Sequence, residues 1–236
     1  MNRLDFLKKG ISSLGVFAAI PVLEACKKED MVGAGDDDPE STSQCAITNA
    51  EIPGPFPIRN PNDLIIKNIV SDRTGVPLWI NITVRNVNSN CENLPGVLVD
   101  IWQCDKDGYY SEYGGNGSQS VNFTNVHFLR GRQTTDSAGL VSWTSIFPGW
   151  YPGRAPHIHV HIYSPSGTSL LVTQIAFSKE VCDVVYRQGV YASHGLQDTT
   201  NERDMVFSDG VSNELAAITG SVVDGFVLNH TINVRA

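Results

Sequence analysis

One stretch organises this chain: Phe147-Pro148-Gly149-Trp150-Tyr151-Pro152-Gly153-Arg154-Ala155-Pro156-His157-Ile158-His159-Val160-His161. Proline and glycine restrict the backbone of its first half, and its second half places histidine at every second position of an expected strand. Because successive side chains of a strand point to opposite faces, His157, His159 and His161 share one face. Two such imidazoles can bind one metal ion, and Tyr151 and Arg154 lie just before them. The stretch therefore predicts a metal site on a β-strand.

Apolar and polar residues alternate in several other segments, as in half-buried strands. The clearest segments are 78–85, 97–102 and 226–234. Further strands are expected at 126–134, 140–146, 157–163 and 169–177, and one or two short helices around 179–187 and 212–218. Many short strands favour a mainly β fold, an antiparallel β-sandwich with long loops and few short helices. The simplest organisation is one domain over residues 45–236, which begins with a proline-rich arm expected to cross the surface.

The net charge of the chain limits the classes of molecule that it is expected to bind. The chain has 236 residues, a net charge of −8 and a sequence pI near 5.1. No basic stripe occurs, so no nucleic acid is expected as a partner. Beyond residue 25 no apolar run reaches the length of a membrane span.

The first 25 residues predict a lipoprotein signal peptide, because a basic start and an apolar segment precede Leu23-Glu24-Ala25-Cys26, which resembles a bacterial lipobox. Cys26 would then carry the lipid, and residues 26–44 would form a disordered acidic tether. The expected location is the cell envelope, periplasmic or surface-facing, with a lipid anchor at Cys26 as the only membrane contact. The alternative is an ordinary thiol after an ordinary signal.

Four further cysteines remain in the expected exported chain: Cys45, Cys91, Cys104 and Cys182. An even number in an exported protein permits two disulfides. Three connectivities are open, and the spacing does not choose between them.

The residues near the histidines indicate which metal is bound. They include tyrosines rather than carboxylates or thiolates. A phenol has an ordinary pKa near 10, so it binds well only to a strongly Lewis-acidic ion. Ferric iron meets this condition, whereas zinc, calcium and magnesium do so poorly. Two histidines with two tyrosines therefore point to Fe(III).

Four segments together resemble the intradiol ring-cleavage dioxygenases, a catechol and protocatechuate dioxygenase-like family, and most of all its exported, single-domain members. They are Trp102 to Tyr110, Phe128 to Gly131, Thr135 to Gly139, and Pro148 to His159. The similarity extends from about Glu51 to the C-terminal strand. It implies a β-sandwich with a non-haem ferric centre.

The resemblance also implies the site residues. Tyr110, Tyr151, His157 and His159 match the metal ligands, with Tyr109 and Tyr113 as less favoured tyrosines and His161 as a supporting or exposed residue. Tyr151 is also implied to be displaced by substrate. Arg154 matches an active-site arginine that offsets charge on the bound substrate, and Gln174 a polar residue near the same pocket; for Gln174 a locally hydrogen-bonded sheet residue is the alternative.

The activity that the resemblance implies is cleavage of a catechol-type ring between its two hydroxylated carbons with O2, which gives a cis,cis-muconate-type diacid. Two other functions compete with it. One is a surface-anchored sandwich module that binds a partner without catalysis, and the other is a copper or zinc enzyme that uses the three histidines alone. Both leave the matching positions of Tyr110 and Tyr151 unexplained.

Overall fold

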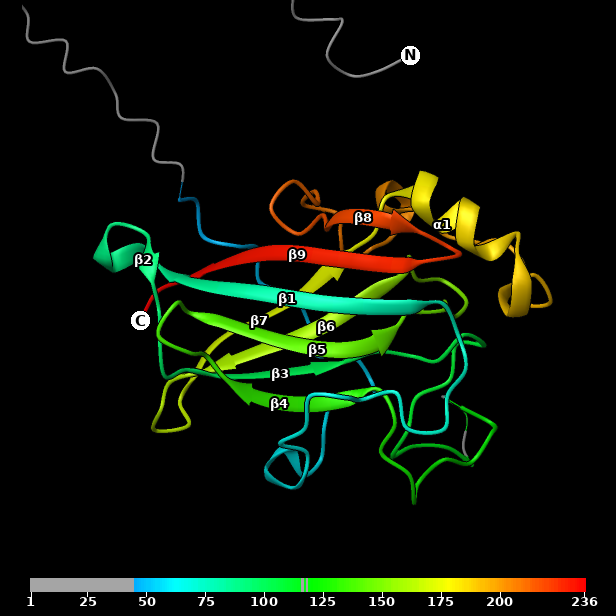
Figure 1. The fold of residues 1–236 in the computed structure, drawn as a ribbon, viewed down its shortest axis with the longest axis horizontal. Coiled ribbons are helices and arrows are strands. Elements are labelled where there is room, and N and C mark those ends of the chain that lie inside the picture. Colours follow the sequence, from blue (N-terminus) through cyan, green and yellow to red (C-terminus); the bar gives the residue numbers. More distant parts are fainter. Residues whose placement is uncertain (1–44, 116, 118) are drawn as a thin grey trace, which may run out of the picture. The chain divides into compact units, whose positions relative to one another are not determined.

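The computed structural model describes residues 45–115, 117 and 119–236, which form two β-sheets lying one against the other (Figure 1). The first sheet has the order β2 (Glu92–Asn93), β1 (Pro77–Asn86), β9 (Gly225–Val234) and β8 (Ala217–Ser221), and β5 (Leu140–Ile146) also pairs with β1. The second sheet has the order β4 (Arg130–Thr134), β3 (Leu98–Trp102), β6 (His157–Tyr163) and β7 (Ser169–Ala176). The predicted mainly β sandwich is confirmed.

The core lies between the sheets and follows the alternation in the sequence. On β1 every second residue, from Leu78 to Val84, is fully buried and packs with the inner rows of β3, β6 and β9. The inward-facing residues of β6 are Ile158, Val160 and Ile162, so the histidines of that strand lie on the outer face of the second sheet.

Three expectations about elements are wrong in part. β9 runs parallel to β1, although antiparallel pairing was expected throughout. Alternation fixes which face a side chain takes and says nothing of strand direction. The strand expected at 126–134 begins only at Arg130, because Leu129 adopts a positive φ of 56° within a turn. The helix expected at 212–218 is absent from this described segment, which instead turns and enters β8 to pair with β9.

The helix expected near 179–187 is confirmed as α1 (Lys179–Tyr186), which begins where the Ser178 side chain accepts a hydrogen bond from the Val181 N–H. Figure 1 shows α1 beside the β8–β9 hairpin at one end of the sandwich. Among the described residues, no helix has both the length and the apolar character to cross a membrane. Short 3-10 helices are η1 (Pro61–Asp63), η2 (Val87–Ser89), η3 (Gly189–Tyr191) and η4 (Asn201–Arg203).

One of the two permitted disulfides forms. Cys45 and Cys91 are bonded, with their Cα atoms 5.9 Å apart. Cys104 and Cys182 are buried as free thiols. They pack in two different apolar clusters, which keeps them from pairing. The disulfide joins the start of the N-terminal arm, residues 45–60, to the segment between β1 and β2.

The N-terminal arm is more buried than a surface crossing would be. Phe56 is almost inaccessible, and further along the chain Leu64 and Ile69 are buried too. The arm bonds to both sheets, since Thr48 donates its N–H to Asn233 O of β9 and Glu51 donates its N–H to Val172 O of β7. The expected signal peptide at 1–25, Cys26 and the tether at 26–44 lie outside the described residues.

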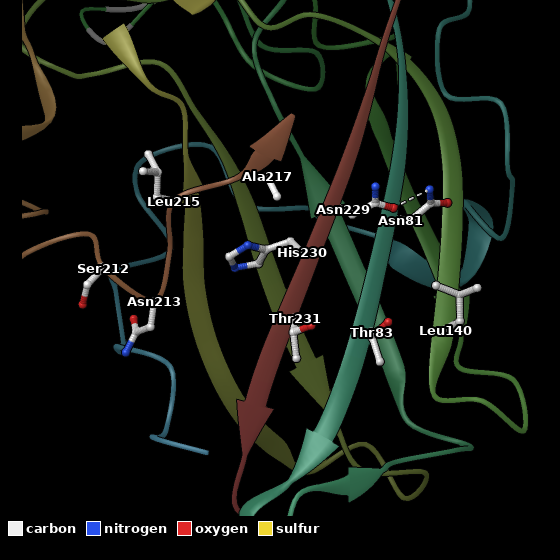
Figure 2. A pocket seen from close by; sticks show the side chains of 10 residues that line it. All are labelled: Asn81, Thr83, Leu140, Ser212, Asn213, Leu215, Ala217, Asn229, His230 and Thr231. Atoms are coloured by element: carbon white, nitrogen blue, oxygen red, sulfur yellow. Dashed lines mark hydrogen bonds between the residues drawn. The ribbon is translucent and has the colours of Figure 1, made fainter. Parts of the chain in front are cut away.

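The outer face of the first sheet carries short polar side chains. Figure 2 shows Asn81 of β1 and Asn229 of β9 joined by a hydrogen bond, while His230 extends to the other side of β9. These residues belong to a groove of about 460 Å³.

Candidate metal centre

Two histidines of β6 bring their ring nitrogens together under the turn that precedes the strand. His157 and His159 are buried, and their Nε2 atoms lie 3.0 Å apart. His157 Nδ1 lies 2.6 Å from the Ala155 carbonyl oxygen, which can only accept, so Nδ1 carries the proton and Nε2 keeps its lone pair. The His159 ring stacks on Trp102 of β3, with centroids 4.8 Å apart. His157 Nε2 thus offers a lone pair, and both rings are held in fixed orientations.

Burial keeps both imidazoles neutral. Desolvation, and then the Arg154 charge, lower the pKa of His157 to about 3. Desolvation, and then His157, hold the pKa of His159 well below its ordinary value. Neutral imidazole is the form that binds metals.

Two tyrosines complete the cluster. Tyr110 is fully buried with its hydroxyl 3.5 Å from His157 Nε2, and its ring lies edge-on to Tyr151 at 5.7 Å between centroids. The Tyr151 and His157 ring centroids are also 5.7 Å apart. Desolvation raises the pKa of both phenols. They would therefore ionise here only beside a strongly attracting cation.

Arg154 connects this cluster with its surroundings. Its Nη1 donates to the Tyr151 hydroxyl at 3.3 Å, and its Nη2 donates to Gln174 Oε1 at 2.5 Å. Its Nε lies 2.9 Å from both carboxylate oxygens of Asp204, so that the guanidinium is held on three sides. A positive charge is fixed beside the phenol and the imidazoles.

Gln174 lies on β7 opposite His159 and uses both ends of its amide. Besides accepting from Arg154, it donates through Nε2 to the Ile52 carbonyl oxygen at 3.0 Å. Its partners are therefore in the turn before β6 and in the N-terminal arm, and neither belongs to the sheet. The alternative of a purely local hydrogen bond is wrong.

The donor set fits a ferric ion. Two neutral imidazoles and two phenols gather in one buried cluster, and their ring centroids lie between 4.6 and 6.1 Å from their neighbours. Phenolate oxygen and imidazole nitrogen suit a small, highly charged, Lewis-acidic metal. The structure brings together all four residues predicted as ligands, and their role as ligands stays a prediction.

Comparison with known proteins shows which family the chain belongs to. The family model described as Dioxygenase matches residues 57–211. The chain belongs to the intradiol ring-cleavage dioxygenase family.

Two solved structures and one curated protein show how close the likeness is. An intradiol ring-cleavage dioxygenase from Tetranychus urticae is 29% identical with a TM-score of 0.73, covering 81% of this chain and 95% of that one. The dioxygenase domain of a dioxygenase and carbohydrate-binding protein fusion from Streptomyces sp. SirexAA-E is 25% identical with a TM-score of 0.60, covering 81% and 99%. Catechol 1,2-dioxygenase of Candida albicans is 26% identical over 213 residues, which are 81% of this chain and 64% of that protein.

In this intradiol dioxygenase chain, a glutamine that sequence reasoning missed holds the backbone of the loop that carries Tyr110. Gln119 Oε1 accepts from the Tyr110 N–H at 2.7 Å, while Gln119 Nε2 donates to the carbonyls of Tyr110, Tyr113 and Val121. The Tyr113 hydroxyl is occupied by the Pro57 carbonyl, and the Tyr109 ring lies by Phe123. Only Tyr110 of the three points to the histidines.

A fully buried arginine ties the N-terminal arm to the Tyr110 loop. Arg130 donates to the side-chain and main-chain oxygens of Ser111 and to the Phe56 carbonyl, at 2.7 to 2.8 Å. Phe56 in turn stacks on Tyr110, with centroids 4.7 Å apart. Gly54 has a φ of +66°, and a Cβ there would lie 3.1 Å from His159 Cε1. The arm thus forms a close wall of the cluster.

Asp204 is a further residue that the sequence did not reveal. It is buried, lies 50 residues after Arg154, and accepts from the Ala155 N–H as well as from Arg154. It stands in a region without alternation, so no local pattern marks it.

His161 lies apart from the cluster. Its Nε2 lies 2.8 Å from the Ser169 hydroxyl oxygen, and its Nδ1 lies 2.7 Å from the Tyr163 hydroxyl oxygen, both within hydrogen-bond distance. Both nitrogens are therefore used elsewhere on the sheet. A copper or zinc site made by the three histidines has no support in this geometry.

Proposed function

We propose that this chain is a non-haem Fe(III) dioxygenase that cleaves a catechol-type ring between its two hydroxylated carbons with O2, giving a cis,cis-muconate-type diacid. One observation carries this proposal: Tyr110, Tyr151, His157 and His159 form one buried cluster beside Arg154. Family membership supports ring cleavage in general. The chain covers 64% of the length of the curated catechol 1,2-dioxygenase, so the activity as a whole is inferred.

The four clustered residues would hold the ferric ion. When bound, it would act as a Lewis acid and template that lowers the pKa of the catechol hydroxyls and orients the ring. His157 and His159 supply neutral nitrogen donors without losing a proton, since burial already keeps them neutral. Tyr110, the more deeply buried tyrosine, is the fixed oxygen donor.

Tyr151 and Arg154 are the residues that would act on the substrate. Tyr151 is only partly buried, and its hydroxyl oxygen lies 3.3 Å from Arg154 Nη1. In the proposed reaction Tyr151 Oη accepts one catechol proton and swings away, leaving the guanidinium to face the negative charge of the bound substrate. Gln174 holds Nη2 of the same guanidinium, which fixes where its charge points.

The visible absorption spectrum tests this function first. Protein expressed without residues 1–26 is expected to show a tyrosinate-to-iron(III) charge-transfer band that shifts on anaerobic addition of catechol. O2 uptake with catechol, hydroxyquinol and protocatechuate then identifies the substrate. Protein that stays colourless after ferric reconstitution would exclude the dioxygenase and favour the binding module.

We also propose that the chain is exported and anchored to the cell envelope by a lipid on Cys26. The Cys45–Cys91 disulfide supports an oxidising location, where such bonds persist. Labelled fatty acid is expected in the membrane fraction of the wild type and to be lost in Cys26→Ala. Equal labelling of both proteins would contradict the anchor.

A further inference from the structure

The free edge of β7 is covered by two segments that are far apart in the sequence. The N-terminal arm bonds to it through the Glu51 N–H and the Val172 carbonyl, at 2.8 Å. Four residues along the strand, Ala176 donates to the Glu214 carbonyl at 2.9 Å. The arm and the 209–214 segment meet there, and two hydrogen bonds between Asn49 and Asn213 join them.

Three carboxylates meet at this junction. Each of Glu51, Asp209 and Glu214 offers an oxygen, and these oxygens all lie within 4.8 Å of one another. Glu214 is fully buried, Glu51 is partly buried and Asp209 is exposed. In the part of the chain that the structure describes, this is the only such group of three acidic, histidine or cysteine side chains.

Glu214 is a buried carboxylate without a counter-ion. Thr173 donates its hydroxyl to Oε1 at 3.1 Å, and Oε2 is buried without any hydrogen-bond partner. None of the ion pairs among the described residues includes Glu51, Asp209 or Glu214. Buried carboxylates are normally paired or bind a metal, because an isolated buried charge is costly. The unpartnered carboxylate of Glu214 faces two further carboxylates.

The electrostatics of the group agree with a missing positive charge. Desolvation, followed by Glu51, raises the pKa of Glu214 to about 8. Desolvation, followed by Asp209, raises the pKa of Glu51 to about 7, and Asp204 adds to the rise while Arg154 opposes it. The cluster has to take up protons or a cation at neutral pH.

We propose that Glu51, Asp209 and Glu214 bind a divalent cation of the calcium class. Calcium takes oxygen ligands in flexible geometry, and carboxylates from distant segments suit it. The exposed side of Asp209 gives the ion access and leaves room for water ligands. A site with three protein side chains corresponds to the weak end of calcium affinities, with Kd about 10⁻⁴ to 10⁻³ M. This inference does not depend on the proposed ring cleavage.

Such an ion would join the arm to the 209–214 segment beside the metal centre. Glu51 precedes Ile52, whose carbonyl accepts from Gln174, and Thr173, the partner of Glu214, precedes Gln174. Ile52 and Thr173, which adjoin the cation site, are thus linked to Gln174, the residue that accepts a hydrogen bond from Arg154. The cation would stabilise the arm in its position beside the cluster of Tyr110, Tyr151, His157 and His159.

Calcium binding to the full chain tests this inference. Protein treated with EGTA and desalted at pH 8 is titrated with CaCl2 by calorimetry, and its Tm is followed in parallel. At a calcium concentration of about 100 Kd, the Tm is expected to rise by about 5 to 10 °C. Asp209→Asn, which changes an exposed side chain, and Glu214→Gln, which preserves the acceptor for Thr173, are each expected to remove most of this rise.

Glu92→Gln is the matched control, because Glu92 is an exposed carboxylate of the two-residue strand β2 outside the cluster. It should retain the full calcium response. Absence of binding heat and of a Tm shift up to about 10 mM calcium would overturn the proposal, since that concentration exceeds the expected Kd range. An equal calcium-induced rise in Tm in the wild type, Asp209→Asn and Glu214→Gln would also overturn the proposal, because the ion would then bind elsewhere.

Discussion

The outer faces of the two sheets differ in how they are covered. On the second sheet, Trp102, His159 and Gln174 are at most 1% exposed, because the N-terminal arm and the loops before β6 lie over them. On the first sheet, Trp79 is 42% exposed, and Asn81 and Asn229 bond to each other in contact with solvent (Figure 2). Both faces belong to strands with the same alternation.

This difference shows that the cover, rather than the strand pattern, creates reactive chemistry. Under the cover, desolvation and nearby charges together move the pKa values of histidines and tyrosines away from their ordinary ranges. On the open face, Asn81 bonds to Asn229 and to Ser142. His230 of the same sheet does not lie on that face: it alternates with Asn229 and Thr231, and burial alone lowers its pKa to about 4.

The largest effect is expected from replacing one histidine of each sheet. His157→Ala should remove the charge-transfer band and lower kcat by at least about 10³-fold, because a lost ligand removes the several kcal/mol that a Lewis-acidic metal contributes. His230→Ala should leave the band and kcat unchanged. Absorption spectra and steady-state O2 uptake measure both, and an unchanged band in His157→Ala would contradict the ligand set.

A smaller loss of kcat is expected when the hydrogen bonds between Asp204 and Arg154 are weakened. Asp204→Asn keeps the shape of the side chain but removes its charge, so kcat should fall by about 10- to 100-fold while iron stays bound. The Arg154→Lys/Asp204→Asn double variant should lose much less than the sum of the single changes, because both act through one guanidinium. Additive losses in ΔG‡ would show that Asp204 acts separately from Arg154.

The buried edge of β7 should give the protein a pH-dependent stability of its own. The pKa of Glu214 is about 8 in the folded protein, above its ordinary value of 4.5, so the folded state holds a proton that the unfolded chain releases. The contribution of Glu214 to stability therefore falls as the pH rises from about 5 to 8 in cation-free buffer. Relative to Glu214→Gln, the wild-type Tm should fall by about 5 °C over this range.

Calcium should abolish that relative fall, since it replaces the proton. Melting curves at several pH values, with and without calcium, measure both responses. Parallel wild-type and Glu214→Gln curves without calcium would mean that Glu214 ionises normally.

The smallest expected effect is a difference in the free energy of unfolding between a variant of Asn229 on the open face and a variant of Gln174 on the covered face. Asn229→Ala on the open face should change the free energy of unfolding by no more than about 0.5 kcal/mol. Gln174→Ala should cost about 1 to 3 kcal/mol, because it leaves the Ile52 carbonyl and an Arg154 N–H without a partner in a buried place. Urea denaturation of both variants provides the comparison, which fails if the two costs are equal.

Alternation along β1, β6 and β9 was sufficient to predict which side chains face the core and that His157 and His159 share a face. It could not predict that β9 runs parallel to β1, because direction is decided by the path of the chain between them. Tyr110 was predicted as a ligand only through the family resemblance, whereas Tyr151 also precedes the histidines directly in the sequence. Gln119 and Asp204 could not be predicted, because they lie outside the strands in segments without a periodic pattern. Arg130 lies in a segment that was expected to form a strand, but alternation says nothing of its bonds to Ser111 and Phe56.

The Cys45–Cys91 disulfide has a consequence for limited proteolysis of the chain. It fastens the arm to the sandwich at the first described residue, and the arm continues from there to Phe56 and the wall of the metal centre. A protease that cuts before Cys45 would therefore leave that wall fixed in place. The cleaved product would keep Phe56 packed against Tyr110, whereas a cut between Cys45 and Phe56 would separate that contact from the disulfide.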